Sequence, residues 1–156
     1  MILNEIRILG IVIIAAILGG IIGFERELAD KPAGLRTHMM VAASSSLLIS
    51  LTNLIGPYLQ IEADIVRIDP TRMIVAIVTG ITFLGAGTII RDRTGVEGLT
   101  TAASLLFVAV LGVTVALYQF VLAIGLTVLN LLILRGVKFF EKHFLDKQQE
   151  GEQESS

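Results

Sequence analysis

The longest uncharged stretch of the chain decides what it can fold into. From Gly98 to Leu134 there is no Asp, Glu, Lys or Arg in 37 residues. A single straight helix of that length would measure about 55 Å, whereas the hydrocarbon core of a bilayer is about 30 Å thick. The stretch is therefore expected to turn back, most readily at the polar pair Tyr118 and Gln119. Each half, about 99–117 and 120–134, then has the length and apolar character of a membrane span.

Three more uncharged segments of spanning length precede this stretch, at about 8–24, 39–55 and 73–90. Over the whole chain 54% of the residues are hydrophobic and 17% are charged, and the charges are bunched between the segments. A soluble domain carries about 25% charged residues, distributed among the apolar ones. The expected fold is therefore all-α, a polytopic membrane bundle of about five transmembrane helices in residues 1–135. A tail, 136–156, is expected to be cytoplasmic, amphipathic at first and disordered from Gln148.

Five spans place the two termini on opposite sides of the membrane. Nine of the twelve Lys and Arg residues then fall on the side of the C-terminus: Arg26, Lys31, Arg36, Arg91, Arg93, Arg135, Lys138, Lys142 and Lys147. The other side receives Arg7, Arg67 and Arg72. Because cytoplasmic loops carry an excess of Lys and Arg, we predict the N-terminus outside and the C-terminus inside. The charged loops at 25–38 and 91–97 would then share the cytoplasmic face.

The sequence contains none of the common catalytic or metal-binding motifs. HExxH, GxSxG, Walker A and CxxC patterns are absent, there is no Cys, and the two His residues are not in ligand spacing. The net charge is −2 and no basic face is present, so a nucleic-acid partner is not expected. We therefore expect no enzymatic activity, and the remaining candidates are carboxylates and small residues near the membrane surface.

The carboxylates of the two cytoplasmic loops allow two interpretations. Mg²⁺ takes oxygen ligands, often one or two carboxylates, and Glu25, Glu27 and Asp92 are the candidates for such a site. Cations such as Arg26 and Arg36 are interleaved with them. Interleaved charges usually form a balanced network that fixes how loops meet. The network is the favoured interpretation, no cofactor is expected, and Mg²⁺ is the one ion to consider.

The segment 79–88, TGITFLGAGT, places three glycines and three threonines within an apolar span. Small residues allow helices to pack closely, which is the common use of such a pattern in membranes. Glycines can instead break a span so that backbone carbonyls line a polar path, as in transporters. Transporters usually keep an ionisable residue near the midplane, and no span here has one, so close packing is favoured.

Five sequence blocks follow one another in a characteristic order: GFERE at 23–27, AGLRTH at 33–38, DPTR at 69–72, GITFLGAG at 80–87 and GLTTAA at 98–103. With these blocks the chain resembles the MgtC/SapB family of bacterial and archaeal membrane proteins. The resemblance covers about residues 8–118, the N-terminal transmembrane domain of the family. The segment after the last span is expected to be too short for the C-terminal cytosolic domain that many members carry.

The resemblance implies a multi-pass protein of the cytoplasmic, or inner, membrane, linked to growth in low magnesium and, in pathogens, to survival in macrophages. It also implies which residues matter. The cytoplasmic loop cluster would comprise Glu25, Arg26, Glu27, Arg36, Thr37, His38, Arg91 and Asp92. Packing, or a polar path, would use Gly80, Gly85, Gly87, Gly98, Thr100 and Thr101. The external loop would contribute Asp69 and Arg72, where Asp69 and Pro70 are also typical of a helix start.

Two functions remain open from the sequence. The leading hypothesis is a non-enzymatic regulator of magnesium, ion or membrane-energy homeostasis that contacts another membrane protein within the bilayer. By resemblance alone that partner is the membrane ATP synthase, and homo-oligomers are a second expectation. The rival is a transporter or channel for Mg²⁺ or another cation, with Glu25, Glu27 and Asp92 at its cytoplasmic mouth.

Overall fold

The structure is a computed structural model that describes the backbone of residues 2–58, 69–93 and 95–153, with side chains except at 53, 55–58, 70 and 137–153. The described residues form five α-helices: α1 (Ile2–Leu28), α2 (Leu35–Tyr58), α3 (Pro70–Thr88), α4 (Leu99–Ala116) and α5 (Phe120–Gln153). Two short strands, β1 (Ile90–Arg91) and β2 (Val96–Glu97), pair as an antiparallel hairpin between α3 and α4. The expected all-α fold is confirmed.

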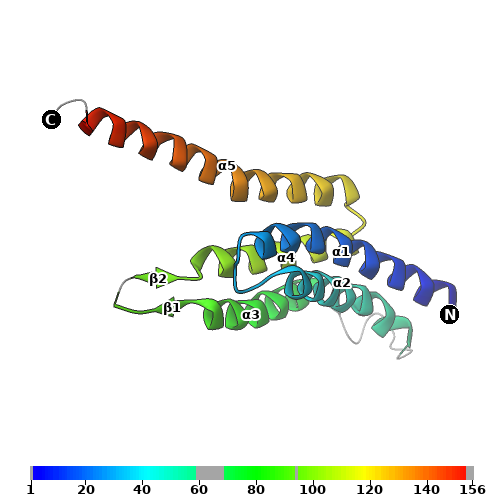
Figure 1. Ribbon diagram of the computed structural model, residues 1–156. Helices are drawn as coiled ribbons and strands as arrows, with labels where there is room; N and C mark the ends of the chain where they lie inside the picture. The colour runs from blue at the N-terminus through cyan, green and yellow to red at the C-terminus, as the bar shows by residue number, and fades with distance from the viewer. Residues whose placement is uncertain (1, 59–68, 94, 154–156) are drawn as a thin grey trace.

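The first four helices form a bundle, and α5 lies across α1 and α4 before it extends away from them (Figure 1). The N-terminus and the turn between α4 and α5 lie at one end of the bundle, and the hairpin lies at the other. The loop between α1 and α2 lies at the hairpin end, so both charged loops meet there. That this end faces the cytoplasm stays a prediction. Arg67, one of the three cations assigned to the other side, lies outside the described residues.

Several helices have the length and composition of membrane spans. Among the described residues α1, the Thr71–Thr88 part of α3, and α4 are long and apolar enough to cross a bilayer, and Phe120–Gly136 is a shorter apolar helix. Helix α2 covers the second predicted span, 39–55. The chain is therefore a multi-pass membrane protein, and each of the five predicted spans falls mainly within one of its helices.

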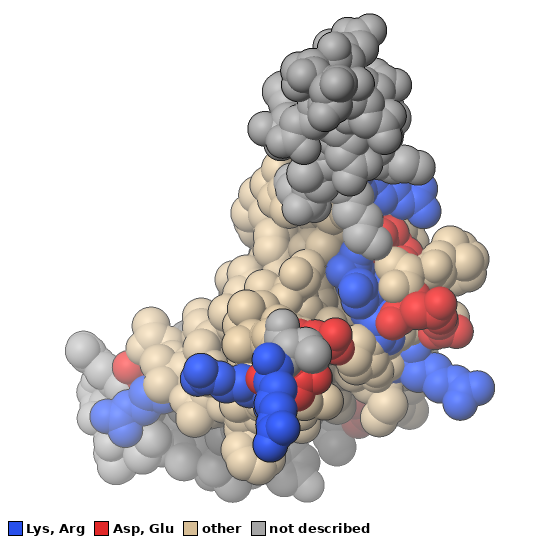
Figure 2. Space-filling model, turned by 60° about the vertical axis from the view of Figure 1, so that its left-hand side comes forward, with Lys and Arg blue, Asp and Glu red and all other residues tan. Residues whose placement is uncertain are grey.

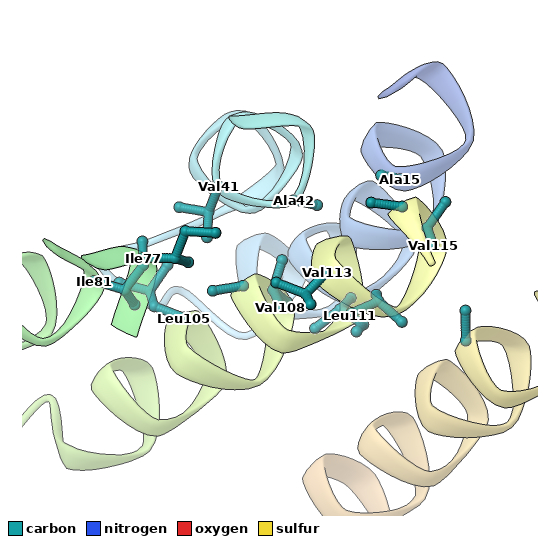
Figure 3. Close-up of a cluster of buried hydrophobic side chains, with 14 of the residues drawn as sticks. Ala15, Val41, Ala42, Ile77, Ile81, Leu105, Val108, Leu111, Val113 and Val115 are labelled. Atoms are coloured by element: carbon teal, nitrogen blue, oxygen red, sulfur yellow. The ribbon is translucent and has the colours of Figure 1, made fainter. Parts of the chain in front are cut away.

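The bundle core lies where α1, α2 and α4 cross, and small residues fill it. Ala42 of α2 is fully buried there, close to Ala15, Val108 and Leu111 (Figure 3). A Cβ atom added to Gly112 would lie 2.3 Å from the carbonyl oxygen of Ala42, so only glycine permits this approach of α4 to α2. Glycines at helix interfaces are the usual means of bringing membrane helices together.

Helix α1 approaches α2 through the glycine motif at 19–23. A Cβ atom on Gly19 would lie 2.7 Å from Cβ of Ala42, and one on Gly23 would lie 2.8 Å from Cβ of His38. Real Cβ atoms do not come this close to other atoms, so both positions require glycine at this helix separation. The spacing of Gly19 and Gly23, four residues apart in an apolar segment, predicts such close helix packing, and the structure confirms it.

Helix α3 packs on the bundle along one face only. Ile77 and Ile81 point toward Val41 and Leu105, which come from α2 and α4 (Figure 3). In the described α3 span 17% of the residues are buried, against 61% in α4. Helix α4 is therefore the central element of the bundle, and α3 lies at its edge.

Two elements differ from the sequence expectation. Residues 90–97 form a hairpin rather than an irregular loop, and α3 ends at Thr88 instead of Ile90. Helix α5 continues from the last span through the tail to Gln153, although the sequence predicts disorder from Gln148. Lys, Glu and Gln, which dominate this tail, are good helix formers, so local propensity accounts for the extra turns.

Candidate functional site

A buried ion pair lies at the cytoplasmic end that we predict for α1. Arg26 Nε donates a hydrogen bond of 2.6 Å to Glu25 Oε2, and the two residues are only 1% and 6% exposed. Both lie in the last two turns of α1, on the side that faces the bundle. Removing two charges from water is unfavourable unless they neutralise each other, so each residue requires its partner.

Glu27 lies in the last turn of α1, just before the loop that connects α1 with α2. Its Oε2 atom accepts a hydrogen bond of 2.8 Å from the backbone N–H of Leu35, the first residue of α2. A helix start leaves such N–H groups without intrahelical partners, and a carboxylate there is also favoured by the helix dipole. A Cβ atom on Gly34 would lie 2.7 Å from the same carboxylate oxygen. Glu27 and Gly34 thus fix where α2 begins.

His38 connects α2 with α4 at the centre of the site. It is fully buried, with Nδ1 at 2.9 Å from the carbonyl oxygen of Gly34 and Nε2 at 3.1 Å from Ser104 Oγ. Ser104 Oγ also lies 2.8 Å from the carbonyl oxygen of Thr101. Both ring nitrogens are therefore engaged, and a chain of polar contacts runs from His38 to the first turn of α4.

The two carbonyl groups fix how protons can be arranged in this chain. A carbonyl oxygen only accepts, so Nδ1 of His38 carries a proton toward Gly34. With neutral His38, the single hydroxyl proton of Ser104 serves either Nε2 or the oxygen of Thr101. With protonated His38, Nε2 donates to Ser104 and the hydroxyl donates to Thr101, so the charged form satisfies both contacts at once.

Burial nevertheless favours the neutral imidazole. His38 precedes the uncharged segment 39–55, and its pKa lies below the ordinary value of 6.5, chiefly because burial penalises the charged form. The carbonyl of Gly34 acts in the opposite direction and raises the pKa, while Arg26 lowers it and Glu25 raises it. The charge of His38 therefore responds to both members of the adjacent ion pair.

The hairpin is held by its turn and by one glycine. Asp92 Oδ1 accepts a hydrogen bond of 2.9 Å from the N–H of Gly95, and the N–H of Asp92 donates to the carbonyl of Gly95 at 3.0 Å. Gly98, which follows β2, has φ +85°, and a Cβ atom there would lie 1.9 Å from the carbonyl oxygen of Thr88. Glycine is thus required for the chain to pass from β2 into α4 beside the end of α3.

A polar cavity lies between the α1–α2 loop and the hairpin. Its volume is about 450 Å³, and its polar lining comprises Asp30, Lys31, Glu97, Thr88, Thr100 and Thr101. Figure 2, in which this end of the molecule comes forward, shows acidic and basic side chains intermingled over it. Thr101 lines the cavity while its carbonyl accepts from Ser104, so the buried contacts of His38 lead directly to the cavity wall.

The predicted cluster is brought to one end of the molecule but is divided into two layers. Glu25, Arg26 and His38 lie buried together at the junction of α1, α2 and α4. Glu27 is exposed in the last turn of α1, and the remaining members are exposed as well: Arg36, Thr37, Arg91 and Asp92. Glu25 and Arg26 form a salt bridge within this cluster. A charge network that joins the two loops stays a prediction.

The carboxylates proposed for a cation do not converge. Glu25 faces Arg26, Glu27 accepts from Leu35, and Asp92 closes the hairpin turn. Within the residues that the structure describes, no group of three or more His, Asp and Glu side chains is arranged to hold a metal ion. Each carboxylate thus has a structural partner, and a metal role for them stays a prediction.

The small residues of the family blocks divide into packed and unpacked positions. Gly85 faces Ala102 of α4, whose Cβ atom would be 3.3 Å from an added Cβ, and Thr101 is buried. Gly80 and Gly87 have no atom within 4 Å of an added Cβ, and Thr100 is exposed on the cavity. Only part of the pattern is used for packing inside this chain.

Asp69 and Arg72 lie away from this cluster, at the start of α3. Asp69 Oδ1 accepts from the N–H and the hydroxyl of Thr71, at 2.9 and 2.6 Å, so it is the N-cap that the sequence predicts. These hydrogen bonds lower the pKa of the Asp69 carboxyl below its ordinary value. Arg72 is exposed.

Sequence reasoning missed Ser104, the residue that connects His38 with the cavity. It also missed Gly112, whose lack of a side chain brings α4 against α2. The only signal in the sequence was the combination of a hydroxyl and a glycine eight residues apart in an otherwise apolar segment. That pattern does not reveal which neighbouring helix each residue faces.

These features define a class: multi-pass α-helical membrane proteins in which a polar loop and a polar hairpin meet at one end of a closely packed bundle. Within that class the chain belongs to the MgtC family, whose model matches residues 12–143. It is 38% identical over 122 residues to the Escherichia coli K12 protein named "Putative magnesium transporter YhiD". The aligned residues make up 78% of this chain and 56% of that protein.

Two proteins named MgtC are similarly related. The Brucella abortus protein is 40% identical over 99 residues, or 64% of this chain and 38% of the relative. The Salmonella typhimurium LT2 protein is 38% identical over 117 residues, or 75% of this chain and 46% of the relative. The chain thus spans about half the length of the curated relatives it matches. No solved structure matches the chain.

Proposed function

We propose that the chain is a non-enzymatic protein of the cytoplasmic membrane that acts in magnesium or ion homeostasis by binding another membrane protein through α3. Membership of the MgtC family and the magnesium-related name of YhiD support the homeostatic role. The outward face of α3 carries the proposal that this role is exercised by helix contact.

The outward face of α3 is made of small residues around one large aromatic side chain. Gly80 and Gly87 are two turns apart and have no atom within 4 Å of an added Cβ. Phe83, between them, is 80% exposed. Ile77 and Ile81, on an adjoining side of the helix, point into the bundle. We call Gly80, Phe83 and Gly87 the outer face of α3.

Such a face is suited to another helix rather than to lipid. Glycine lowers helix stability by about 1 kcal/mol relative to alanine, so it is unfavourable where nothing packs against it. At membrane helix interfaces glycine is instead favourable, because it allows backbones to approach and a neighbouring large side chain to insert. The glycines that face inward, at positions 19, 23 and 112, show that this chain uses glycine in that way.

The rival function is cation transport, which the name of YhiD favours. The centre of the α1, α2 and α4 junction is filled by Ala42, which lies close to both Gly19 and Gly112. The buried carboxylate of Glu25 is already neutralised by Arg26. Both observations favour a binding role over a transport path through this junction.

Glycine substitutions on the outer face test the proposal without disturbing the bundle. Gly80→Leu and Gly87→Leu would add side chains where no atom of the chain lies within 4 Å, so the fold should persist. In a strain that lacks its own copy of the gene, the unchanged chain should restore growth in low magnesium. Neither of the two substituted chains should restore it. Gly125→Leu is the matched control, since Gly125 of α5 has equally open surroundings. Normal growth with Gly80→Leu would contradict the proposal.

Flux measurements test the rival directly. Purified protein in proteoliposomes that enclose a magnesium indicator should show no uptake above that of empty vesicles. Saturable uptake that is lost in Glu25→Ala and retained in Gly80→Leu would establish transport and overturn the binding role.

A further inference from the structure

We infer that the end of the bundle opposite the hairpin contains a binding site for a phosphate group. A cavity of about 130 Å³ lies there between the beginning of α1, the end of α2 and the turn after α4. It is lined by Asn4 and Arg7 of α1, Ser50 of α2 and Tyr118 of the turn, with apolar residues completing the wall. A cavity needs about 10–15 Å³ to hold one water, so this one has room for a group of several heavy atoms.

One buried hydroxyl and one arginine of this cavity have donor groups that the described residues do not pair. Ser50 is 4% exposed, and its hydroxyl has no hydrogen-bond partner among the described residues. A buried hydroxyl without a partner is unfavourable and calls for a ligand or water at that position. Arg7 forms no salt bridge within the described part of the chain, and its one recorded contact is with the ring of Tyr118. The cavity therefore offers positive charge and donors, which fit an anion.

The register of α1 aims the donors at the same place. Asn4, Arg7 and Ile8 are three and four residues apart, so they share one face of the helix. Glu5 is two residues from Arg7 and lies on a different side. The acidic side chain nearest in sequence therefore does not compete for the guanidinium, which is planar and matches the oxygens of a phosphate in two-point contact.

Tyr118 provides a second and independent observation. The turn after α4 has the two hydrogen bonds of a Schellman motif, from Tyr118 N to Val115 O at 2.9 Å and from Gln119 N to Thr114 O at 3.2 Å. The residue at the position of Tyr118 in this motif is usually glycine, because it takes a left-handed conformation. Tyr118 has φ +60°. An aromatic residue held there indicates that its ring, rather than the turn, is required.

The ring of Tyr118 positions Arg7 over the cavity. The guanidinium carbon of Arg7 lies 5.8 Å from the centre of the ring, a cation–π contact. Phe120 packs edge-on against the ring, with the centroids 6.1 Å apart. Arg7 immediately precedes the uncharged segment 8–24, and Tyr118 interrupts the longest uncharged stretch, so both lie where the bilayer meets water. Phosphate groups are available at that level from lipid headgroups as well as from solution.

Binding measurements on the purified full chain can identify the ligand and its source. The protein is held in a maltoside detergent, which contains no phosphate, and its unfolding temperature is followed by circular dichroism. One arm adds a short-chain phosphatidylglycerol, one adds inorganic phosphate, and one adds chloride at equal ionic strength. A saturable rise of the unfolding temperature with the phospholipid alone identifies a headgroup site. A rise with inorganic phosphate identifies a site for the free anion. Chloride should leave the unfolding temperature unchanged.

Substitutions then assign the effect to the cavity. Arg7→Gln removes the charge and should weaken phosphate binding about tenfold or more, the usual effect of losing a charged hydrogen bond. Tyr118→Gly relaxes the turn, so the ligand-free protein should unfold at the same or a higher temperature while phosphate binding weakens. Ser50→Ala should likewise weaken binding without lowering the unfolding temperature of the ligand-free protein. Arg93→Gln, an exposed arginine at the hairpin end, is the control and should bind as the unchanged chain does.

The separation of stability from binding makes the inference falsifiable. If Tyr118 and Ser50 served only the fold, their substitution would change the unfolding temperature and leave the binding constant unchanged. That result would overturn the inference. The absence of a phosphate-dependent shift in both ligand arms, or equal binding by Arg7→Gln, would overturn it as well.

Discussion

At the scale of single residues, glycines of this chain are distinguished by what surrounds them. Gly98 combines φ +85° with the carbonyl of Thr88 at the place where a Cβ atom would be. Gly95, three residues earlier in the same hairpin, has no atom within 4 Å of an added Cβ. The same residue type thus serves an obligatory turn in one case and tolerates substitution in the other.

This contrast leads to a stability prediction. Gly98→Ala should lower the free energy of unfolding by more than about 1 kcal/mol, since alanine neither favours the left-handed conformation nor fits beside Thr88. Gly95→Ala should change it by less than about 0.5 kcal/mol. Because the chain contains no Trp, unfolding in mixed detergent is best followed by circular dichroism. Equal effects of the two substitutions would show that the contact with Thr88 is not as described.

His38 gives a prediction about pH. Its pKa is lowered in the folded protein, so the unfolded chain takes up a proton first as the pH falls. Stability should therefore be complete above pH 6.5 and decrease as the pH falls through the interval below 6.5 toward the folded-state pKa. Unfolding measured from pH 8 to pH 5 should show this decrease in the unchanged chain and a smaller one in His38→Gln.

Asp69 does not confuse this measurement. Its pKa is also lowered, from an ordinary value of 3.8, so its contribution is present above that value and is lost only as the pH falls below it. The interval just below pH 6.5 therefore reports on His38. A flat profile for the unchanged chain there would contradict the assignment of His38 as a buried neutral group.

At the scale of elements, the packing of α4 against α2 depends on Gly112. Gly112→Ala would place a methyl group 2.3 Å from the carbonyl oxygen of Ala42, so the two helices must separate. We expect a loss of about 1–3 kcal/mol, as in other overpacked cores. Gly125→Ala in α5, where no atom lies within 4 Å, should be neutral or slightly stabilising. A neutral Gly112→Ala would mean that α2 and α4 are further apart than the structure has them.

The sequence predicts the helices well because long uncharged segments have few alternatives to helices in a membrane. It also predicts the cap at Asp69 and the close packing at 19–23, which depend on local spacing. It does not predict the hairpin, because two-residue strands leave almost no pattern. It predicts close packing by the small residues of 79–88, whereas only one of the three glycines there, Gly85, packs inside the described chain, since the direction of a helix face is set by its neighbours.

The candidate site shows the same limit. The sequence placed Glu25, Arg26 and His38 in one cluster with Arg36 and Asp92, and the structure separates the buried members from the exposed ones. Spacing in the sequence indicates that residues share a loop, but burial depends on which helix packs against that loop. Here that helix is α4, through Ser104.

At the scale of the whole molecule, the buried ion pair distinguishes a structural role of Glu25 from a transport role. Glu25→Gln leaves Arg26 buried without its partner and should destabilise the fold by about 3–5 kcal/mol. The double substitution Glu25→Gln with Arg26→Met removes both charges and should recover much of that loss. Unfolding in mixed detergent measures both effects. A stable Glu25→Gln protein that has lost only a cation-dependent activity would instead indicate that Glu25 acts on a cation.

The proposed contact with another membrane protein is made by the outer face of α3, and the composition of the chain allows a sensitive test of that contact. The sequence contains no Cys, so a single introduced thiol is the only one that can be cross-linked. Phe83→Cys places it on the outer face, and Val121→Cys places it at a side chain of α5 that is 88% exposed. Both positions lie in apolar spans, so lipid exposure alone would make them react alike.

The most direct test is cross-linking of these two variants in intact cells starved of magnesium, with the adducts identified by mass. We predict that Phe83→Cys yields one discrete adduct with a different membrane protein, that Val121→Cys does not, and that adding Gly80→Leu removes the adduct. Equal cross-linking at both positions, an adduct containing only a second copy of this chain, or no adduct at all would contradict it.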